Sequence, residues 1–312
     1  MEGLKRFFVK HFEKIIVFLV LLGVVIINYF APYKIGFLNF FYLPIILAGY
    51  SLGKRMAVLT ALLCISIVIL LFLISPSSFF SEMEKIPVIF SLTAWSSFLI
   101  ITSAALGYLY EEKQKRIVDL KSAYVGILEI LSKYLESADK YTQGHSVRVS
   151  HMSEDIARAM GLPSYERENI KVAALLHDIG KTEISMDIVQ KAAALTSSEK
   201  ELMDSHSEKG ARIISLVGGV LEEAVPIVLA HHKYYFETKG NPSEGKEEIP
   251  IGAAIIAVVD AYDAMITDRP YRAGRPPWKA FEEIEKNSGK LFDPEVVKAF
   301  KEVLMSQKKY RE

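Results

Sequence analysis

The sequence is poor in cysteine and has no excess of charge of either sign. Cys64 is the only cysteine among 312 residues, which excludes an intrachain disulfide. Its place in an apolar run predicts a small buried hydrophobic side chain. Lys plus Arg equals Asp plus Glu at 37 each, and this balance gives no basic surface for a nucleic-acid polymer. The charge is nevertheless uneven, because residues 1–110 hold eight basic and four acidic residues.

Ionisable side chains are missing from four long apolar segments in the first third of the chain. Each segment has about 17–23 residues, enough to cross a hydrocarbon core of ~30 Å as a helix. Without ionisable groups inside them, a proton relay or ion pathway is not expected. We therefore predict four transmembrane helices in a membrane domain over residues 1–108, serving as a plain anchor or as a sensor of a membrane or periplasmic cue. The segments are Ile15–Ala31, Ile35–Gly53, Met56–Ser75 and Ile86–Tyr108.

The basic residues around these segments predict their orientation. They gather before the first segment, between the second and third, and after the fourth, so the positive-inside rule places both termini in the cytoplasm. The first segment has no small-residue cleavage site after it, which predicts that it is retained. The sequence thus predicts a multi-pass protein of the inner (cytoplasmic) membrane, in contact with the lipid bilayer. The basic residues are Lys5, Arg6, Lys10, Lys14, Lys54, Arg55, Lys113, Lys115 and Arg116.

A proline-free amphipathic stretch follows the membrane segments. Its apolar residues recur at alternating spacings of three and four, which is a heptad pattern. Two interpretations are compatible: the later half packs on the core of the next domain, and the early half pairs with a second copy in a parallel homodimer. We expect a helical, coiled-coil-like linker over 109–122 and a second domain over 123–312. The heptad residues, here called the seam, are Ile117, Leu120, Tyr124, Ile127, Leu131, Tyr134 and Ala138.

The second domain carries a set of histidines and aspartates typical of a metal site. The apolar run before His177 and Asp178 leads into an adjacent nitrogen and oxygen ligand, and an aspartate can bridge two cations. Gly180 then lets the backbone turn away, and Lys181 brings an ammonium group close to any bound anion. The further candidates are His145, which precedes this pair in the chain, and His206, His231, His232 and Asp260, which follow it. Asp263, one turn after Asp260, is either a residue that orients a ligand or a surface charge.

The number and type of these side chains bear on the metal. Five imidazoles and two carboxylates exceed the four ligands of tetrahedral zinc. They suit two octahedral divalent cations, for which iron or manganese is the expected choice. The sequence therefore predicts a binuclear centre with Asp178 as the bridge.

Residues from about 121 to 305 resemble the HD-GYP branch of the HD metal-dependent phosphohydrolase superfamily. The matching segments are Tyr141–Val149, Leu175–Lys181, the segment around His206, His231–His232, Ile249–Pro250, Val258–Met265, Asp268–Arg272 and Gly289–Val297. The resemblance implies an all-α fold and hydrolysis of the bacterial second messenger cyclic di-GMP. It implies metal ligation by His145, His177, Asp178, His206, His231, His232 and Asp260, catalysis by Asp178 and Lys181, and substrate contacts from Lys181, Arg269 and Arg272.

The sequence departs from this family at several positions. Tyr141 stands where some members have a third-metal Glu, which implies two metals. Lys233 replaces a Glu, Phe236 an Asp and Ala254 an Arg, and Gly240-Asn241-Pro242 stands in place of Gly-Tyr-Pro. Three functions follow as hypotheses: a membrane-anchored cyclic di-GMP phosphodiesterase, an HD-type hydrolase of another phosphorylated nucleotide, and a non-catalytic receptor or interaction module.

Overall fold

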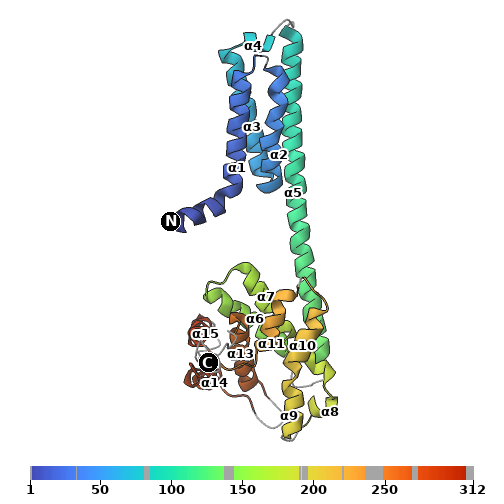
Figure 1. Ribbon diagram of the computed structural model, residues 1–312, viewed down its shortest axis with the longest axis vertical. Coiled ribbons are helices and arrows are strands. Elements are labelled where there is room, and N and C mark those ends of the chain that lie inside the picture. The colour runs from blue at the N-terminus through green and yellow to red at the C-terminus, as the bar shows by residue number, and fades with distance from the viewer. Residues whose placement is uncertain are drawn as a thin grey trace, which may run out of the picture. The chain divides into compact units, whose positions relative to one another are not determined.

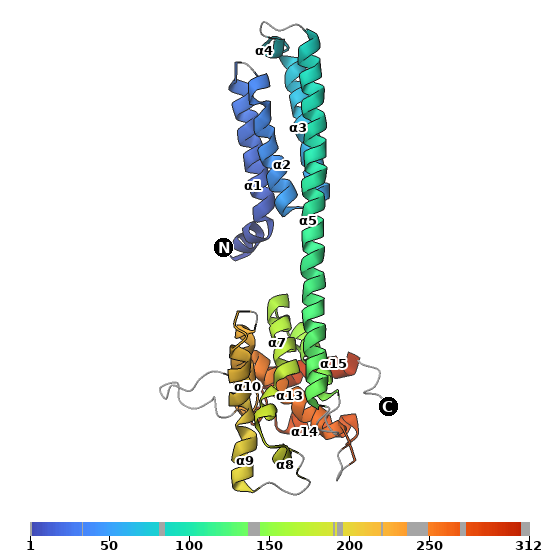
Figure 2. The ribbon, with the colours of Figure 1, turned by 90° about the vertical axis from the view of Figure 1, so that its right-hand side faces the viewer.

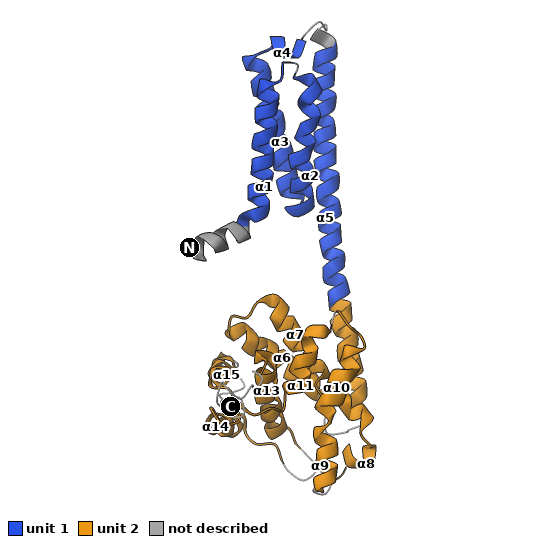
Figure 3. Ribbon diagram, in the orientation of Figure 1, with its two compact units in different colours: residues 1–121 blue, residues 122–312 orange. Residues whose placement is uncertain are grey.

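The structure is a computed structural model that describes residues 2–32, 34–80, 85–136, 144–189, 191, 196–219, 221–235, 249–268 and 273–306. These residues form helices, with one isolated bridge between Ser288 and Phe292 and no strand among them. The predicted all-α class is confirmed. The chain divides into two compact units, residues 1–121 and 122–312 (Figure 3).

Unit 1 is a bundle of apolar helices around a small core. Its elements run alongside one another (Figures 1 and 2). The core includes Phe41 and Leu99, and Cys64 is fully buried within it, as predicted. The indole Nε1 of Trp95 donates to the carbonyl oxygen of Leu38 at 3.1 Å, which joins two elements 57 residues apart. The elements are α1 Glu2–Phe30, η1 Ile35–Phe41, α2 Tyr42–Ser51, α3 Lys54–Ile74, α4 Ser77–Phe80 and the first part of α5 Lys85–Glu136.

Three helical stretches among the described residues, the third of which continues into unit 2, are long and apolar enough to span a membrane. They are His11–Phe30, Lys54–Ile74 and Pro87–Glu136, and at most 28% of the apolar window in each is buried. Their apolar side chains therefore point mainly outward, as expected of helices in lipid. The second predicted segment is shorter and divided, because Ile35–Phe41 is a 3-10 helix that continues as α2. Three of the four predicted spans are thus found as long helices, and the second is the exception.

The end of α5 belongs to unit 2 and packs within it mainly through residues outside the seam. Leu128, Ser132 and Glu136 are only 6%, 2% and 7% exposed, and their spacing of four puts them on one stripe. Ile127 and Tyr134 of the seam are instead 64% and 74% exposed. The interpretation that the later seam packs on the chain's own core is therefore wrong for these two residues, although Tyr124 does contact that core. Ala138 lies outside the described residues.

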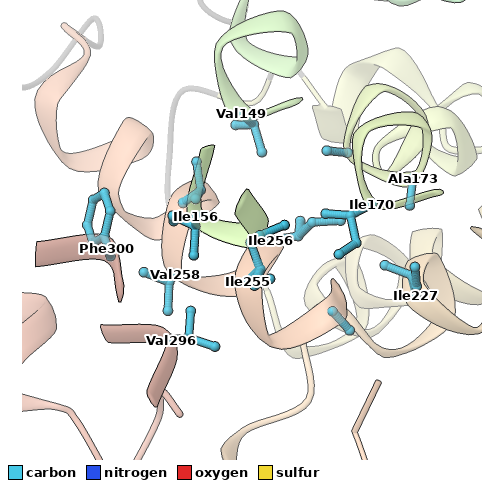
Figure 4. Packing of buried hydrophobic residues seen from close by; sticks show 14 of the residues in the cluster. Val149, Ile156, Ile170, Ala173, Ile227, Ile255, Ile256, Val258, Val296 and Phe300 are labelled. Atoms are coloured by element: carbon cyan, nitrogen blue, oxygen red, sulfur yellow. The ribbon is translucent and has the colours of Figure 1, made fainter. Parts of the chain in front are cut away.

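Unit 2 is a helical domain built around α13. This helix is apolar on most of its surface because neighbours cover several of its sides. Figure 4 shows Ile255, Ile256 and Val258 of α13 between residues of α6, α7, α11 and α15, among them Ile156 and Phe300. The described helices are α6 His145–Ala159, α7 Ser164–Leu176, η2 Ile179–Glu183, α8 Met186–Val189, α9 Ser197–Asp204, α10 His206–Ser215, η3 Glu222–Ala224, α11 Val225–Ala230, α13 Ile251–Ile266, α14 Pro277–Lys286 and α15 Pro294–Ser306.

Candidate metal centre

The candidate ligands lie mostly at helix ends that meet beside this core. His145 is the first residue of α6 and His206 the first of α10, whereas His177 directly follows α7. Two groups have ligand atoms within 4.8 Å of one another: His145, His177 and Asp178 in one, and His206, His231 and His232 in the other. Asp260, on α13, joins the first group, with Oδ1 3.2 Å from Nε2 of His145. The structure thus brings all seven predicted candidates together.

Three of the imidazoles are oriented by the carbonyl three residues earlier. Nδ1 of His177 donates to Ala174 O at 2.8 Å, and His206 and His231 donate to Met203 O and Val228 O, both at 2.6 Å. A carbonyl oxygen only accepts, so Nδ1 must carry the ring proton. The neutral ring then presents a bare lone pair at Nε2, which is the state that a metal ligand requires.

These Nε2 atoms face one another at distances that fit a cation. Nε2 of His206 lies 3.3 Å from Nε2 of His231 and 3.2 Å from Nε2 of His232. His206 and His231 have their protons on Nδ1, so the 3.3 Å contact between their Nε2 atoms sets two lone pairs against each other. Burial lowers the pKa of His206 and of His231. For His206 the charge of Asp178 raises the pKa, but burial has the larger effect. A divalent cation removes the repulsion, and the donor set therefore fits a metal ion.

His145 is oriented by a carboxylate instead of a carbonyl. Its Nδ1 donates to Oδ2 of Asp263 at 2.8 Å, and Nε of Arg148 donates to Oδ1 of the same carboxylate at 2.7 Å. Burial lowers the pKa of His145, but the hydrogen bonds to Asp260 and Asp263 outweigh burial and raise it to about 10. Asp263 is only 4% exposed, so it orients a candidate ligand and is not a surface charge. Sequence reasoning missed Arg148, whose signal was its place three residues after His145.

Asp178 lies between the two groups. Its Oδ2 is 3.5 Å from Nε2 of His177, and its Oδ1 is 3.6 Å from Nε2 of His206. Nζ of Lys181 donates to Oδ2 at 2.6 Å. Burial raises the pKa of Asp178, but the charges of Lys181 and the nearby histidines outweigh it and hold the pKa well below the usual range. The carboxylate is therefore ionised, with one oxygen directed to each group.

Gly180 is required for the approach of α10 rather than for an unusual backbone angle. It is not among the described glycines with positive φ. A Cβ built on it would lie 2.0 Å from the carbonyl oxygen of His206 and 2.5 Å from the amide nitrogen of Gly210. The backbones of η2 and α10 thus touch at this point, and this contact brings His206 next to Asp178. The close approach, and the part of Gly210 in it, could not be read from the sequence.

An open cavity lies at the edge of the second group. Its volume is ≈ 370 Å³, and its lining includes His232, Lys233, Tyr234 and Glu208. Of the seven candidate ligands only His232, an exposed residue, lines it. The predicted substrate contacts Arg269 and Arg272 lie outside the described residues, as do Tyr141, Phe236 and residues 240–242.

Histidines and aspartates that meet at the ends of helices in two groups form a candidate metal centre of the kind that metal-dependent hydrolases use. The model of the family described as "HD domain" matches residues 129–296, more than half of the chain. The chain therefore belongs to the HD domain family, and the predicted resemblance to HD-type metal-dependent phosphohydrolases is confirmed.

Three curated relatives are similar to part of this chain. A "Cyclic di-GMP phosphodiesterase" of Thermotoga maritima is 43% identical over 56% of this chain and 48% of its own length. "Cyclic di-GMP phosphodiesterase PA4108" of Pseudomonas aeruginosa is 36% identical over 53% of this chain and 40% of its own. "3'3'-cGAMP-specific phosphodiesterase 3" of Vibrio cholerae is 32% identical over 59% of this chain and 40% of its own. The chain thus spans less than half the length of each relative.

Proposed function

We propose that this chain is a membrane-anchored, metal-dependent phosphodiesterase that hydrolyses cyclic di-GMP. The observation that carries the proposal is the convergence of histidine and aspartate ligand atoms in two groups that Asp178 connects. The family assignment and the names of the relatives from Thermotoga maritima and Pseudomonas aeruginosa support the reaction and the substrate. The proposal keeps residues 1–108 as the membrane domain, 109–122 as the linker and 123–312 as the phosphohydrolase domain.

Two divalent cations, iron or manganese, are proposed for the centre. The first group and Asp260 would hold one cation, the second group the other, and Asp178 would bridge them. The full ligand set is His145, His177, Asp178, His206, His231, His232 and Asp260. Nitrogen and carboxylate donors in this number favour two six-coordinate ions over one tetrahedral zinc.

The chain's own residues would position the substrate and neutralise its charge. Bound cations supply an activated water and stabilise charge on the phosphate. Lys181 sits beside the proposed bridge, so its ammonium can approach a non-bridging phosphate oxygen as negative charge develops there. Arg269 and Arg272 are proposed to contact phosphate or the guanine edge with their guanidinium groups. Asp178 and Lys181 are thus the proposed catalytic pair.

Membrane anchoring is proposed with four crossings, the second made by η1 and α2. Seven residues of 3-10 helix and ten of α-helix reach about 29 Å together, close to the hydrocarbon thickness of ~30 Å. The distribution of basic residues supports cytoplasmic termini and a cytoplasmic catalytic domain in the inner membrane. An even number of crossings is what this orientation requires.

A parallel homodimer is proposed through the seam. Ile117 and Leu120 are 49% and 74% exposed in the single chain, and a second copy is the simplest way to bury such a stripe. Leu128, Ser132 and Glu136 pack within unit 2 further along the same helix, so one helix can make the two contacts in turn.

A second candidate substrate is another cyclic dinucleotide. The relative from Vibrio cholerae is named for 3'3'-cGAMP, and the departures at Phe236 and Asn241 affect the segment that distinguishes the family branch. These changes support a base preference different from that of a typical cyclic di-GMP enzyme. The non-catalytic receptor is the less favoured hypothesis, because such a receptor does not need a full ligand set.

The test is turnover by the full chain in detergent or nanodiscs, loaded with manganese or iron. Cyclic di-GMP, 3'3'-cGAMP and a generic aryl phosphodiester are supplied in parallel, and products are separated by chromatography. The linear dinucleotide from cyclic di-GMP is the expected product. Cleavage of 3'3'-cGAMP alone would transfer the assignment to the second candidate. No cleavage of any substrate by fully metallated protein would leave the receptor hypothesis.

A further inference from the structure

Glu136, in the last turn of α5, is bonded to the start of α6. Its Oε2 accepts from the amide of Gly144 at 2.6 Å, and its Oε1 accepts from the amide of Ser146 at 2.6 Å. The side chain is only 7% exposed, so these charge-assisted bonds are shielded from water. Both carboxylate oxygens of one helix end are therefore committed to the first turn of the next helix.

This contact does the work of a helix cap that α6 lacks. The N-cap residue is Gly144, with φ +73° and no side chain to accept from the following amides. At most helix starts a Ser, Thr, Asp or Asn side chain accepts from the second or third amide. Glu136 takes that place from outside the helix, and its negative charge also suits the positive end of the helix dipole.

The residue between the two bonded amides is His145. Glu136 therefore holds the backbone on both sides of this candidate ligand, whereas Asp263 of α13 holds its ring through Nδ1. Arg148 links the two carboxylates electrostatically: Asp263 raises its pKa by a hydrogen bond, and the charge of Glu136 adds to that effect. His145 is thus fixed twice, by its ring from α13 and by its main chain from α5.

We infer that Glu136 is a positioning residue of the metal centre, through which the last turn of α5 sets the position of His145. The inference rests on the proposed function, because it takes His145 as a ligand. Leu128 and Ser132 anchor the same stripe of α5 to unit 2, so this stripe and the first turn of α6 form one rigid contact. A rotation or shift at the end of α5 therefore acts on His145 first. His177, His206 and His231 are oriented by carbonyl groups of their own helices, so the same movement reaches them later.

The experiment compares Glu136→Gln with Glu129→Gln in the full chain. Gln keeps the size of the side chain, but it faces one of the two amides with an NH₂ group. Cobalt(II) is titrated against a chelator and followed by its visible absorption, which reports ligand geometry without any substrate. For Glu136→Gln we expect cobalt affinity to fall by about 10–100-fold, as for other residues that orient a ligand, with a changed spectrum. Glu129→Gln, seven residues earlier in α5, should match the wild type.

Hydrogen exchange separates positioning from a loss of stability. In Glu136→Gln the amides of Gly144 and Ser146 should exchange faster, while that of Met160, at the other end of α6, keeps its wild-type rate. Faster exchange at the two amides with unchanged cobalt affinity and spectrum would overturn the inference and leave a simple cap. If Glu136→Gln does not fold, the same two amides are compared in wild type with and without metal, where an equal rate would overturn it. A wild type that binds no metal would overturn the proposed function, and the inference with it.

Discussion

Oδ2 of Asp263 lies 2.8 Å from Nδ1 of His145, and this one bond decides which ring nitrogen faces the candidate metal centre. The carboxylate is itself held by Arg148 at 2.7 and 2.8 Å. Because a carboxylate only accepts, the ring keeps a proton on Nδ1, and Nε2 is the nitrogen from which a cation can displace a proton.

Asp263→Asn should weaken metal binding. The amide NH₂ of Asn can donate to Nδ1, which moves the ring proton to Nε2 and blocks ligation there. We expect affinity for manganese or cobalt to fall by about 10–100-fold, measured by competition with a chelator. Asp155→Asn is the control: Asp155 lies on α6, the helix of His145, and pairs with the surface residue Arg158. Equal affinity of the two variants would contradict the orienting role.

Metal loading at pH 7 should release a proton from His145. The pKa of this residue is raised to about 10 by its two carboxylate neighbours against the effect of burial, so the ring is protonated before loading. Burial lowers the pKa of His206 and His231, and these rings are already neutral and release none. Calorimetric titrations in buffers of different ionisation enthalpy count the protons released. A count of zero would show that the cation does not displace the proton of His145.

Gly180→Ala should damage the centre through packing. The new Cβ would lie 2.0 Å from the carbonyl oxygen of His206, and two main chains cannot yield as a flexible side chain does. We expect a loss of about 1–3 kcal/mol in the free energy of unfolding and weaker metal binding, followed by thermal unfolding and chelator competition. Gly126→Ala is the control, since nothing lies within 4 Å of its Cβ and a helical Ala is expected to be neutral or stabilising. Similar behaviour of both variants would refute the close approach.

Asp178→Ala and Lys181→Ala should have different effects. Removal of the proposed bridge should lower metal content from two ions per chain and abolish turnover. Removal of the ammonium should leave metal content unchanged and lower kcat, because Lys181 is proposed to act on phosphate. Elemental analysis and steady-state kinetics on the full chain measure the two effects. Loss of metal from Lys181→Ala would instead assign this residue to holding Asp178 in place.

Charged residues in the seam should dissociate the proposed dimer. Ile117→Glu with Leu120→Glu places like charges where two copies would meet, so light scattering of the solubilised protein should report a shift toward monomer mass. Val118→Glu is the control, as Val118 is 60% exposed but lies off the heptad positions. An unchanged mass in the double variant would exclude the seam as the contact between copies.

The seven candidate ligands could be proposed from sequence because most of them lie within or at the end of an apolar helical segment. The order of His145, His177, Asp178 and the later residues was sufficient, with no knowledge of how the helices pack. The role of Asp263 could not be predicted without the packing of the helices. Its hydrogen-bond partner His145 is 118 residues away, and the sequence pattern of α13 does not show which of its sides faces His145. Gly180 is similar, because only the docking of α10 makes its missing side chain necessary.

The two stripes of α5 show another limit. Ile127 and Leu128 are adjacent, yet the first is 64% exposed and the second 6%. A heptad count selects Ile127 because its stripe is the apolar one, whereas the covered stripe continues from Leu128 into the polar residues Ser132 and Glu136. The second membrane segment differed for a local reason, because its first seven residues take the tighter 3-10 form.

Three imidazoles of the centre take their direction from a carbonyl in their own turn: His177 from Ala174, His206 from Met203 and His231 from Val228. The aim of each ring is therefore a local property of its helix and does not depend on the presence of the other ligands. A scaffold of this kind can lose one ligand by a single substitution while the remaining rings keep their direction and the fold keeps its shape. The evolutionary distance between an enzyme and a metal-poor binding protein on this fold is then very short.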